Sequence, residues 1–260
     1  MQYDVIVLGL GGVGSSAAYH LAKAGRRVLG LEQFSCAHSK GSSHGETRAI
    51  RKAYFEHPSY VPLLHSSYAA WRELEELSGS QLLFEQGLLE IGPPQGVLIK
   101  GLREACQQHQ LELQDVSRNE FRKRFPNFLL PSGSEAVFEP DGGFLLVEDC
   151  VRCFCEGAKD LGAELRFNSA VSGWRVREGK VEVACGGEIV RAERLVVAAG
   201  AWSNELLCDL GFEIRILRKH LHWYRVPQGM FAGNLSSPVF FYDTPDGFYY
   251  GFPSLEFGDF

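Results

Sequence analysis

The order of apolar and polar positions predicts a strand, a helix and a second strand at the N-terminus. An unbroken apolar run over Val5–Leu8 is typical of a buried strand, and another covers Val28–Leu31. Between them a glycine cluster is followed by helical spacing of apolar residues from about Val13 to Lys23.

Similar patterns predict elements in the rest of the chain. Helices are expected at 60–77, 96–110, 117–125 and 147–161. The third of these begins at a Ser117 N-cap, has Glu120 in capping-box spacing and stops at Pro126. Strands are expected within 82–92, 163–176, 180–185 and 193–198, and a helix follows the last of them. The segments 214–226 and 239–254 alternate in polarity and predict antiparallel sheet with an Asp-Gly turn.

The order of these elements predicts a mixed α/β fold whose two domains are each discontinuous in sequence. The first two strands, the "AELRFN" strand and the "RLVVAAG" strand are expected in one parallel sheet, although long stretches separate them. We expect a Rossmann-like cofactor domain over 1–80 and 145–212. A substrate domain built on antiparallel sheet is expected over 81–144 and 213–260.

The glycines of the first turn carry the first candidate chemistry. Gly9, Gly11 and Gly14 form G-x-G-x-x-G between the first strand and the first helix. In that context the first glycine allows the tight turn, the second lets a pyrophosphate approach and the third permits close packing. Glu32 ends the second strand, where a carboxylate binds ribose hydroxyls and repels a 2′-phosphate. The motif predicts FAD or NAD rather than NADP.

Composition excludes several function classes. The 260 residues are 45% hydrophobic and carry a net charge of −6 without a long basic run, so nucleic acid is not an expected partner. The sequence has no signal-peptide pattern and no apolar run of the ~20 residues that a membrane span needs. Seven irregularly spaced cysteines favour reduced thiols, and we expect a cytoplasmic protein.

The stretch "GSSHGETRAIRKAY", from Gly41 to Tyr54, is the most specific part of a family resemblance. Together with the glycine motif, "RLVVAAGAWSNELL" and "YYGFPS", it resembles the monomeric sarcosine oxidase family, which includes N-methyl-tryptophan oxidase and the peroxisomal sarcosine/pipecolate oxidases. These are FAD enzymes of the D-amino-acid-oxidase-like fold, so the resemblance favours FAD over NAD.

The resemblance implies roles for individual residues. Arg51 is expected to clamp a substrate carboxylate through the planar fork of its guanidinium group. Arg48 and Thr47 are expected against the flavin ring with His44 close by, and Tyr250 is expected in the substrate cavity. The complete set expected to bind the cofactor is Gly9, Gly11, Gly12, Gly14, Glu32, Ser43, Thr47, Arg48, Val171 and Gly200.

The implied reaction is oxidation of a secondary amino acid such as sarcosine, another N-methyl amino acid or pipecolate. A hydride passes to flavin N5, the resulting imine is hydrolysed, and O₂ is reduced to hydrogen peroxide. The alternatives are an FAD dehydrogenase with another electron acceptor, an FAD-binding fragment or subunit without turnover and, last, an NAD dehydrogenase. The sequence does not choose among the substrates.

The chain departs from the family pattern at its end. Members continue beyond the position of Phe260 with an oxygen-activating lysine, a flavin-tethering cysteine and a glycine-rich segment. We therefore consider a truncated portion of a longer monomeric enzyme, a short form with non-covalent FAD, and a non-catalytic partner. The 260-residue chain is expected to expose apolar surface and to self-associate.

Some cysteines and histidines suggest metal ligation but are not assigned to a metal site. Cys150 and Cys153 share a helix face from which Cys155 points away, and no second ligand pair follows, so no metal is expected. His220 and His222 alternate along a predicted strand without an acidic or cysteine partner nearby, which favours a surface or a cavity lining over metal ligation.

Overall fold

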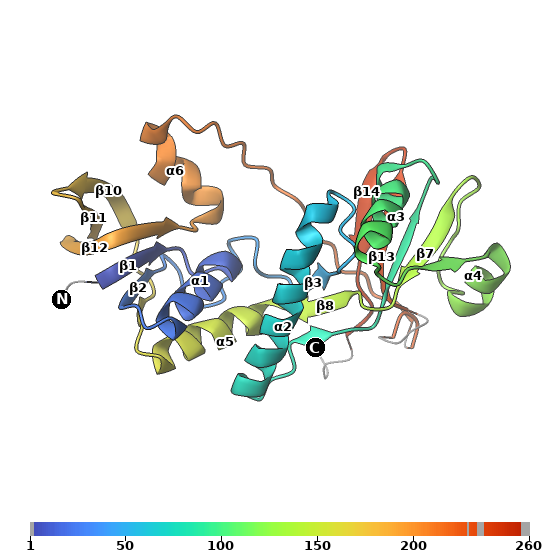
Figure 1. The fold of residues 1–260 in the computed structure, drawn as a ribbon, viewed down its shortest axis with the longest axis horizontal. Coiled ribbons are helices and arrows are strands. Elements are labelled where there is room, and N and C mark those ends of the chain that lie inside the picture. The colour runs from blue at the N-terminus through green and yellow to red at the C-terminus, as the bar shows by residue number, and fades with distance from the viewer. Residues whose placement is uncertain (1–2, 228, 233–236, 256–260) are drawn as a thin grey trace. The chain divides into compact units, whose positions relative to one another are not determined.

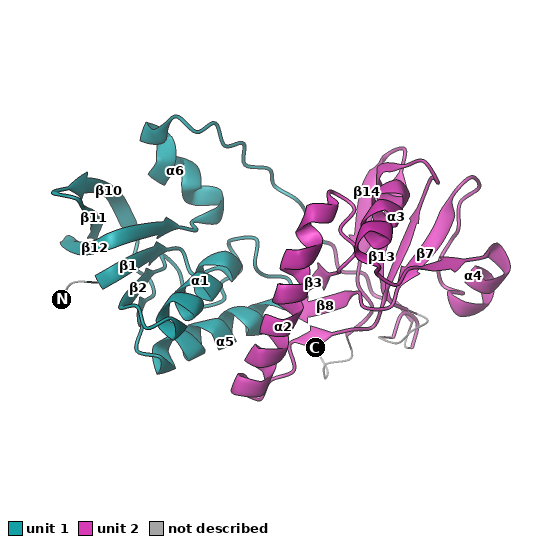
Figure 2. Cartoon of the chain, in the orientation of Figure 1, with its two compact units in different colours: residues 1–46, 146–221 teal, residues 47–145, 222–260 magenta. Residues whose placement is uncertain are grey.

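The computed structural model describes residues 3–227, 229–232 and 237–255, and the chain forms two compact units. Unit 1 consists of residues 1–46 and 146–221, and unit 2 of residues 47–145 and 222–260 (Figure 2). Each unit is therefore assembled from two stretches of chain that are distant in sequence. Within the described ranges, no helix has the length and apolar character needed to cross a membrane.

Unit 1 contains a six-stranded sheet with two larger helices, α1 and α5 (Figure 1). Its elements are β1 (Tyr3–Leu8), α1 (Gly12–Lys23), β2 (Val28–Leu31), α5 (Val147–Asp160), β9 (Glu164–Arg166), β10 (Val171–Arg177), β11 (Lys180–Cys185), β12 (Glu188–Val197), η2 (Gly200–Trp202), α6 (Ser203–Leu207) and η3 (Cys208–Leu210).

The sheet of unit 1 has the order β10-β11-β12-β1-β2-β9. β1 pairs in parallel with both β12 and β2, so that Val7 lies opposite Val196 on one side and Gly30 on the other. β9 pairs in parallel with β2, while β10, β11 and β12 form an antiparallel meander. The predicted parallel sheet is confirmed, including the two strands that come from the later part of the chain.

Residues 5–8 of β1 and the whole of β2 are apolar and buried, as expected for strands whose two faces are both covered. Ile6 and Leu29 are completely buried in the core of the sheet. α1 packs against α5, where the rings of Tyr19 and Phe154 have their centroids 5.5 Å apart. This packing holds the N-terminal end of α1 at the edge where β1 and β2 end.

Unit 2 contains a five-stranded sheet, a three-stranded sheet and helices α2 to α4. Its elements are β3 (Thr47–Ile50), η1 (Pro58–Tyr60), α2 (Val61–Ser78), β4 (Leu83–Phe84), β5 (Leu88–Gly92), α3 (Val97–His109), β6 (Gln114–Val116), α4 (Arg118–Arg124), β7 (Glu135–Glu139), β8 (Gly143–Leu146), β13 (Val239–Thr244) and β14 (Gly247–Gly251).

The larger sheet of unit 2 has the order β14-β13-β5-β7-β6 and is antiparallel except between β13 and β5. β13 and β14 form the predicted hairpin, in which Thr244 pairs with Gly247 across the turn. The Ser117 hydroxyl accepts the N–H of Glu120 at 3.3 Å, which confirms the predicted start of α4.

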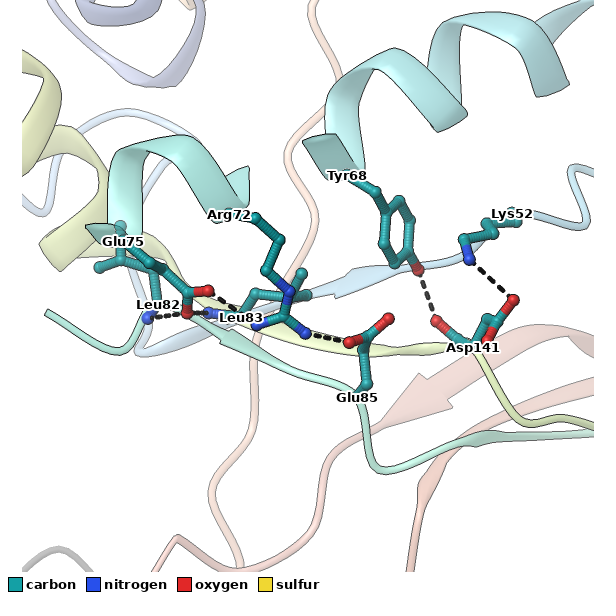
Figure 3. Close-up of polar contacts among 8 residues, drawn as sticks. All are labelled: Lys52, Tyr68, Arg72, Glu75, Leu82, Leu83, Glu85 and Asp141. Carbon is teal, nitrogen blue, oxygen red and sulfur yellow. Dashed lines mark hydrogen bonds and ion pairs between the residues drawn. The ribbon is translucent and has the colours of Figure 1, made fainter. Parts of the chain in front are cut away.

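Polar contacts fasten α2 to the strands of unit 2 (Figure 3). The hydroxyl of Tyr68 donates to the carbonyl oxygen of Asp141 at 2.7 Å, and the carboxylate of Asp141 pairs with Lys52 at 2.7 Å. Oε1 of Glu75 accepts the N–H groups of both Leu82 and Leu83 at 2.8 Å, which ties the end of α2 to β4.

Two sequence expectations differ from the structure. Residues 47–80 lie in unit 2 rather than in the cofactor unit, because β3 joins the sheet β3-β8-β4 and α2 is fastened to that sheet. The strand predicted at 214–226 is wrong: residues 212–227 form neither helix nor strand, and most of their side chains are exposed. Alternating polarity alone does not make a strand when no neighbouring strand pairs with it.

Candidate functional site

A pocket in unit 1 gathers most of the residues expected to bind the cofactor. It lies where β1, β2 and β12 end, at the N-terminus of α1. Its lining includes these predicted residues: Gly9, Gly11, Gly12, Glu32, Ser43, Val171 and Gly200. The crevice beyond the carboxyl ends of parallel strands is the usual ligand position in open α/β sheets.

Gly9 and Gly14 build the turn that leads into the pocket. Gly9 has a φ of +87°, and a Cβ at this position would lie 2.5 Å from the carbonyl oxygen of Ala198. A Cβ on Gly14 would lie 1.8 Å from the carbonyl oxygen of Gly9. Gly14 is absent from the pocket lining. Its geometry therefore serves the close packing of α1 against the β1 turn.

Gly11 and Gly12 present the first turn of α1 to the pocket. Gly11 is the N-cap of α1 and supplies no side chain to cap it. Only the Ser43 hydroxyl, at 3.6 Å, lies near a Cβ built on Gly11, so the space in front of this residue is open. The N–H of Gly12 donates to the same hydroxyl at 2.9 Å. An open helix N-terminus of this kind favours a phosphate group.

Glu32 is held rigidly at the end of β2. Its Oε2 accepts the N–H of Leu10 at 2.8 Å, and its Oε1 accepts the N–H of Phe34 at 3.0 Å. Nε2 of His38 lies 3.4 Å from Oε1. Each carboxylate oxygen has a second acceptor site, so these bonds leave capacity for a sugar hydroxyl. Glu32 therefore joins the glycine turn to the loop after β2 and faces the pocket with a fixed orientation.

Sequence reasoning missed several residues of the pocket wall. His38 and Trp202 both line the pocket, and each packs its ring against Phe34, with centroids 4.7 and 5.3 Å away. Ser169 lies beside Val171 in the same lining. His38 lies in a loop, Ser169 just before β10 and Trp202 in a short 3-10 helix, and no periodic pattern marked them.

His44 lies in a loop that α5 anchors. The carboxylate of Glu148, in the first turn of α5, accepts the N–H of Gly45 at 2.7 Å and that of Glu46 at 3.1 Å. Both Gly45 and Glu46 have positive φ values, of 91° and 68°. The side chain of His44 is half-buried, and the residue is not part of the pocket lining.

Thr47, Arg48 and Arg51 belong to unit 2, at β3 and just after it. Thr47 is buried, and the guanidinium of Arg48 donates to the carbonyl oxygen of Thr47 at 2.6 Å. Nη2 of Arg51 lies 2.8 Å from both carboxylate oxygens of Glu56. The Arg51 side chain is 11% exposed, and its guanidinium carbon lies 4.3 Å from the ring centroid of Tyr54.

Phe241 links Arg51 with Tyr250 inside unit 2. The guanidinium of Arg51 lies 5.1 Å from the Phe241 ring, and the Tyr250 ring meets the same ring edge-on at 5.7 Å. Tyr250 lies on β14 and is half exposed. Arg51, the predicted carboxylate clamp, and Tyr250, the predicted cavity residue, therefore both contact Phe241.

Two buried carboxylates near Arg51 were not predicted. Glu139 places Oε1 2.6 Å from the N–H of Lys52 and 3.0 Å from that of Ala53, directly after Arg51. Glu90 on β5 is completely buried, and among the described residues neither of its oxygens has a hydrogen-bond partner. Burial raises the pKa of both side chains, and the charge of Arg51 opposes this rise.

Metal ligation finds no support in the described part of the chain, where no group of three or more His, Cys, Asp or Glu side chains could hold an ion. Cys150 and Cys153 are buried on α5, and Cys155 is buried as well.

Comparisons with known proteins identify the family of this chain. The model of the family described as "FAD dependent oxidoreductase" matches residues 4–258. Monomeric sarcosine oxidase of Streptomyces avermitilis is 37% identical over 98% of this chain, and N-methyl-L-tryptophan oxidase of Yersinia pestis is 33% identical over 98%. The structure of NikD, an unusual amino acid oxidase essential for nikkomycin biosynthesis, aligns with 99% of this chain at 25% identity and a TM-score of 0.81.

The chain spans about two thirds of the length of these relatives: 67% of the sarcosine oxidase, 68% of the N-methyl-L-tryptophan oxidase and 67% of NikD. The predicted family resemblance is confirmed, and the mixed α/β fold with it.

Proposed function

Because the chain belongs to the FAD dependent oxidoreductase family, we propose that its unit 1 pocket binds FAD and that the protein oxidises the CH–NH bond of a secondary amino acid. The observation that carries the proposal is the pocket itself. An open helix N-terminus at Gly11 and a fixed carboxylate at Glu32 face one cavity.

These residues suit the two polar parts of a dinucleotide. The N–H groups in the first turn of α1 would hold the pyrophosphate, because they carry the positive end of the helix dipole. Glu32 would accept ribose hydroxyls, and Val171 and Ser169 would lie against the adenine. Thr47, Arg48 and His44 are proposed near the flavin ring, in line with the family resemblance.

Arg51 is proposed to bind the substrate carboxylate. Its guanidinium is largely buried among aromatic rings, which strengthens its attraction for an anion. Glu56 now accepts hydrogen bonds from Nη2 of Arg51 through both of its carboxylate oxygens, and a substrate carboxylate would take its place. Tyr250, on the far side of the shared Phe241 contact, is proposed to line the substrate cavity.

Bound FAD would supply the hydride acceptor for oxidation of the carbon next to the substrate nitrogen. Hydrolysis of the resulting imine and reduction of O₂ to hydrogen peroxide would complete the oxidation. Sarcosine, N-methyl amino acids and pipecolate are the proposed substrates, in keeping with the names of the related oxidases.

The proposed cellular setting is the cytoplasm, without a nucleic-acid or membrane partner. All seven cysteines are free thiols, as a reducing compartment requires. Light scattering of the purified chain tests the accompanying expectation that these 260 residues self-associate.

The deciding experiment is the visible absorption spectrum of the purified chain after incubation with FAD, before and after anaerobic addition of sarcosine or pipecolate. A retained flavin spectrum that bleaches with substrate supports both parts of the proposal. Retained flavin that never bleaches refutes turnover by this chain and favours a cofactor-binding portion. A colourless protein refutes the assigned pocket.

Arg51→Ala tests the carboxylate clamp separately. The affinity for a small carboxylic acid inhibitor should fall by at least about tenfold, since one charge-assisted bidentate contact is lost. Arg103→Ala is the matched control, because Arg103 is also ion-paired, with Asp115 and Glu135, but is exposed on α3. Equal inhibitor affinity in the Arg51 variant and the control would remove Arg51 from the substrate site.

A further inference from the structure

Glu139 holds the backbone immediately after Arg51. It is the last residue of β7 and is almost completely buried, with 1% of its surface exposed. Its Oε1 accepts the N–H of Lys52 at 2.6 Å and that of Ala53 at 3.0 Å. The ammonium group of Lys52 pairs instead with Asp141 at 2.7 Å. Among the described residues, the hydrogen bonds of the Glu139 carboxylate are therefore both to backbone groups.

These two hydrogen bonds act on Arg51 through the peptide plane. The N–H of Lys52 belongs to the peptide bond that joins Arg51 to Lys52, and this bond is planar. A hydrogen bond at that N–H therefore restricts the ψ angle of Arg51, and the bond to Ala53 restricts the next peptide in the same way. Residues 51–57, all within the described ranges, form neither helix nor strand. Side-chain contacts such as those of Glu139 therefore set the course of this stretch.

The register of the larger sheet of unit 2 puts Glu139 and Phe241 on one face. Glu139 lies opposite Leu88 on β5, and Phe241 lies opposite Glu90, two residues further along the same strand. Directly opposite residues, and residues two apart in a strand, project from the same face. The guanidinium carbon of Arg51 lies 5.1 Å from the centroid of the Phe241 ring. Because β3 belongs to the smaller sheet, Glu139 ties the end of β3 to the face that Arg51 contacts.

We propose that Glu139 is a positioning residue, which holds the guanidinium of Arg51 against Phe241 by fixing the two peptides that follow Arg51. The inference rests on the role proposed above for Arg51 as the clamp of a substrate carboxylate. A buried carboxylate costs free energy that an apolar side chain of similar size avoids, so stability alone does not explain Glu139. A guanidinium that is already held in place binds an anion more tightly, because less side-chain freedom is lost on binding.

The first measurement is the rate at which phenylglyoxal modifies Arg51 in the FAD-incubated chain, followed by mass spectrometry of peptides that contain residue 51. In Glu139→Ala this rate should rise at least about tenfold, because Arg51 is released when hydrogen bonds to a charged acceptor are lost. The exposed Arg103 is the internal reference and should react at the same rate in every variant. An Arg51 rate that stays unchanged or falls in Glu139→Ala would overturn the proposal.

Glu75→Ala is the matched control, because Glu75 also holds two backbone N–H groups of unit 2 through one carboxylate oxygen. A loss of stability alone would speed the modification of Arg51 in both variants, whereas the proposal expects the rise only in Glu139→Ala. Glu139→Gln should restore slow modification, since its amide oxygen accepts the same two N–H groups. Modification as fast in Glu139→Gln as in Glu139→Ala would overturn the proposal. Glu139→Leu and Glu75→Leu replace the alanine pair if circular dichroism shows that Glu139→Ala is unfolded.

Ligand binding separates this inference from the proposed function. The Kd of a small carboxylic acid inhibitor should rise at least about tenfold in the FAD-incubated Glu139→Ala variant. The Kd for FAD should stay the same, because the cofactor pocket lies in unit 1 and Glu139 in unit 2. Equal inhibitor affinity in Glu139→Ala and Glu75→Ala would count against the positioning role. If the wild-type chain binds no inhibitor, the proposed clamp fails, while the modification rates still decide whether Glu139 positions Arg51.

Discussion

An added methyl group at Gly11 and at Gly14 should have opposite principal effects, although both glycines belong to the same motif. At Gly14 the new Cβ would lie 1.8 Å from the carbonyl oxygen of Gly9 and 2.8 Å from its carbonyl carbon. Non-bonded heavy atoms normally approach to about 3.5 Å, so α1 must move away from the turn by more than about 1 Å. The obstacle is backbone, and no side-chain rotation relieves it.

The expected loss of stability for Gly14→Ala follows from two opposing contributions. Overpacking against backbone should cost about 3 kcal/mol, the upper part of its usual range. The better helix propensity of alanine returns about 1 kcal/mol, so the free energy of unfolding should fall by about 2 kcal/mol. In Gly11→Ala the backbone has an ordinary φ of −71° and the nearest atom is 3.6 Å away. Loss of stability there should stay below about 1 kcal/mol.

Affinity for FAD should fall more in Gly11→Ala than in Gly14→Ala, the reverse of the order expected for stability. The Gly11 methyl group would occupy the open space proposed for the pyrophosphate, so the Kd for FAD should rise at least about tenfold, or 1.4 kcal/mol. Urea unfolding followed by circular dichroism and FAD titration followed by flavin fluorescence measure the two quantities. Gly173→Ala is the control, since Gly173 has a negative φ and open space around its Cβ. A folded Gly11→Ala variant that binds FAD normally would refute the reasoning, and so would an unchanged unfolding midpoint for Gly14→Ala.

Three further predictions concern unit 2. Glu90→Gln should stabilise the protein increasingly as pH rises above 4.5, the ordinary pKa of a glutamate side chain. Burial raises the pKa of Glu90 in the folded state, so the folded wild-type protein keeps a proton that the unfolded chain has lost. The stability of the wild-type protein therefore falls by at most about 1.4 kcal/mol per pH unit, and the variant escapes this loss. Melting temperatures measured between about pH 5 and pH 8 check this slope, and parallel curves for variant and wild type would contradict it. Glu75→Ala should cost about 2 to 4 kcal/mol in urea unfolding, because the buried N–H groups of Leu82 and Leu83 lose their acceptor; the exposed Glu76→Ala serves as control, and equal midpoints for the two would show that water replaces the carboxylate. Phe125→Ala should cost about 3 to 5 kcal/mol, since this completely buried ring packs against Phe121, Phe128 and Phe138; Leu129→Ala, at an 81% exposed side chain, should change little, and a Phe125 variant as stable as that control would refute the packing argument.

The sequence pattern predicted correctly those elements whose local residue preferences agree with their tertiary contacts. Val5–Leu8 is apolar throughout because both faces of this strand are buried, and the glycines that follow have one compatible turn geometry. The segment 214–226 failed as a strand because strand formation also needs a pairing partner, which alternation does not reveal. The boundary at residue 80 differed because pairing between β3 and β8 is a long-range contact.

In the candidate site too, residues placed by local spacing were predicted, whereas residues placed by tertiary contacts were missed. The glycine turn and Glu32 were visible in the sequence because their spacing is imposed by one strand-turn-helix unit. His38 and Trp202 reach the pocket from a loop and a short 3-10 helix whose course depends on tertiary contacts. Glu90 and Glu139 were missed because a carboxylate normally signals solvent, and only the structure shows them buried. The roles assigned to Arg48, Arg51, His44 and Tyr250 stay predictions.

Because Val7 pairs with Val196, β1 cannot complete its sheet pairing until the ribosome has synthesised β12. At a synthesis rate of about 5 to 20 residues per second, β12 emerges roughly 10 to 40 seconds after β1. During that time one edge of a largely apolar strand has no partner, and unpaired edges of this kind pair with other chains. Folding of unit 1 therefore depends on protecting this nascent strand until β12 has been synthesised, so slower elongation or loss of chaperones should lower the yield of native protein.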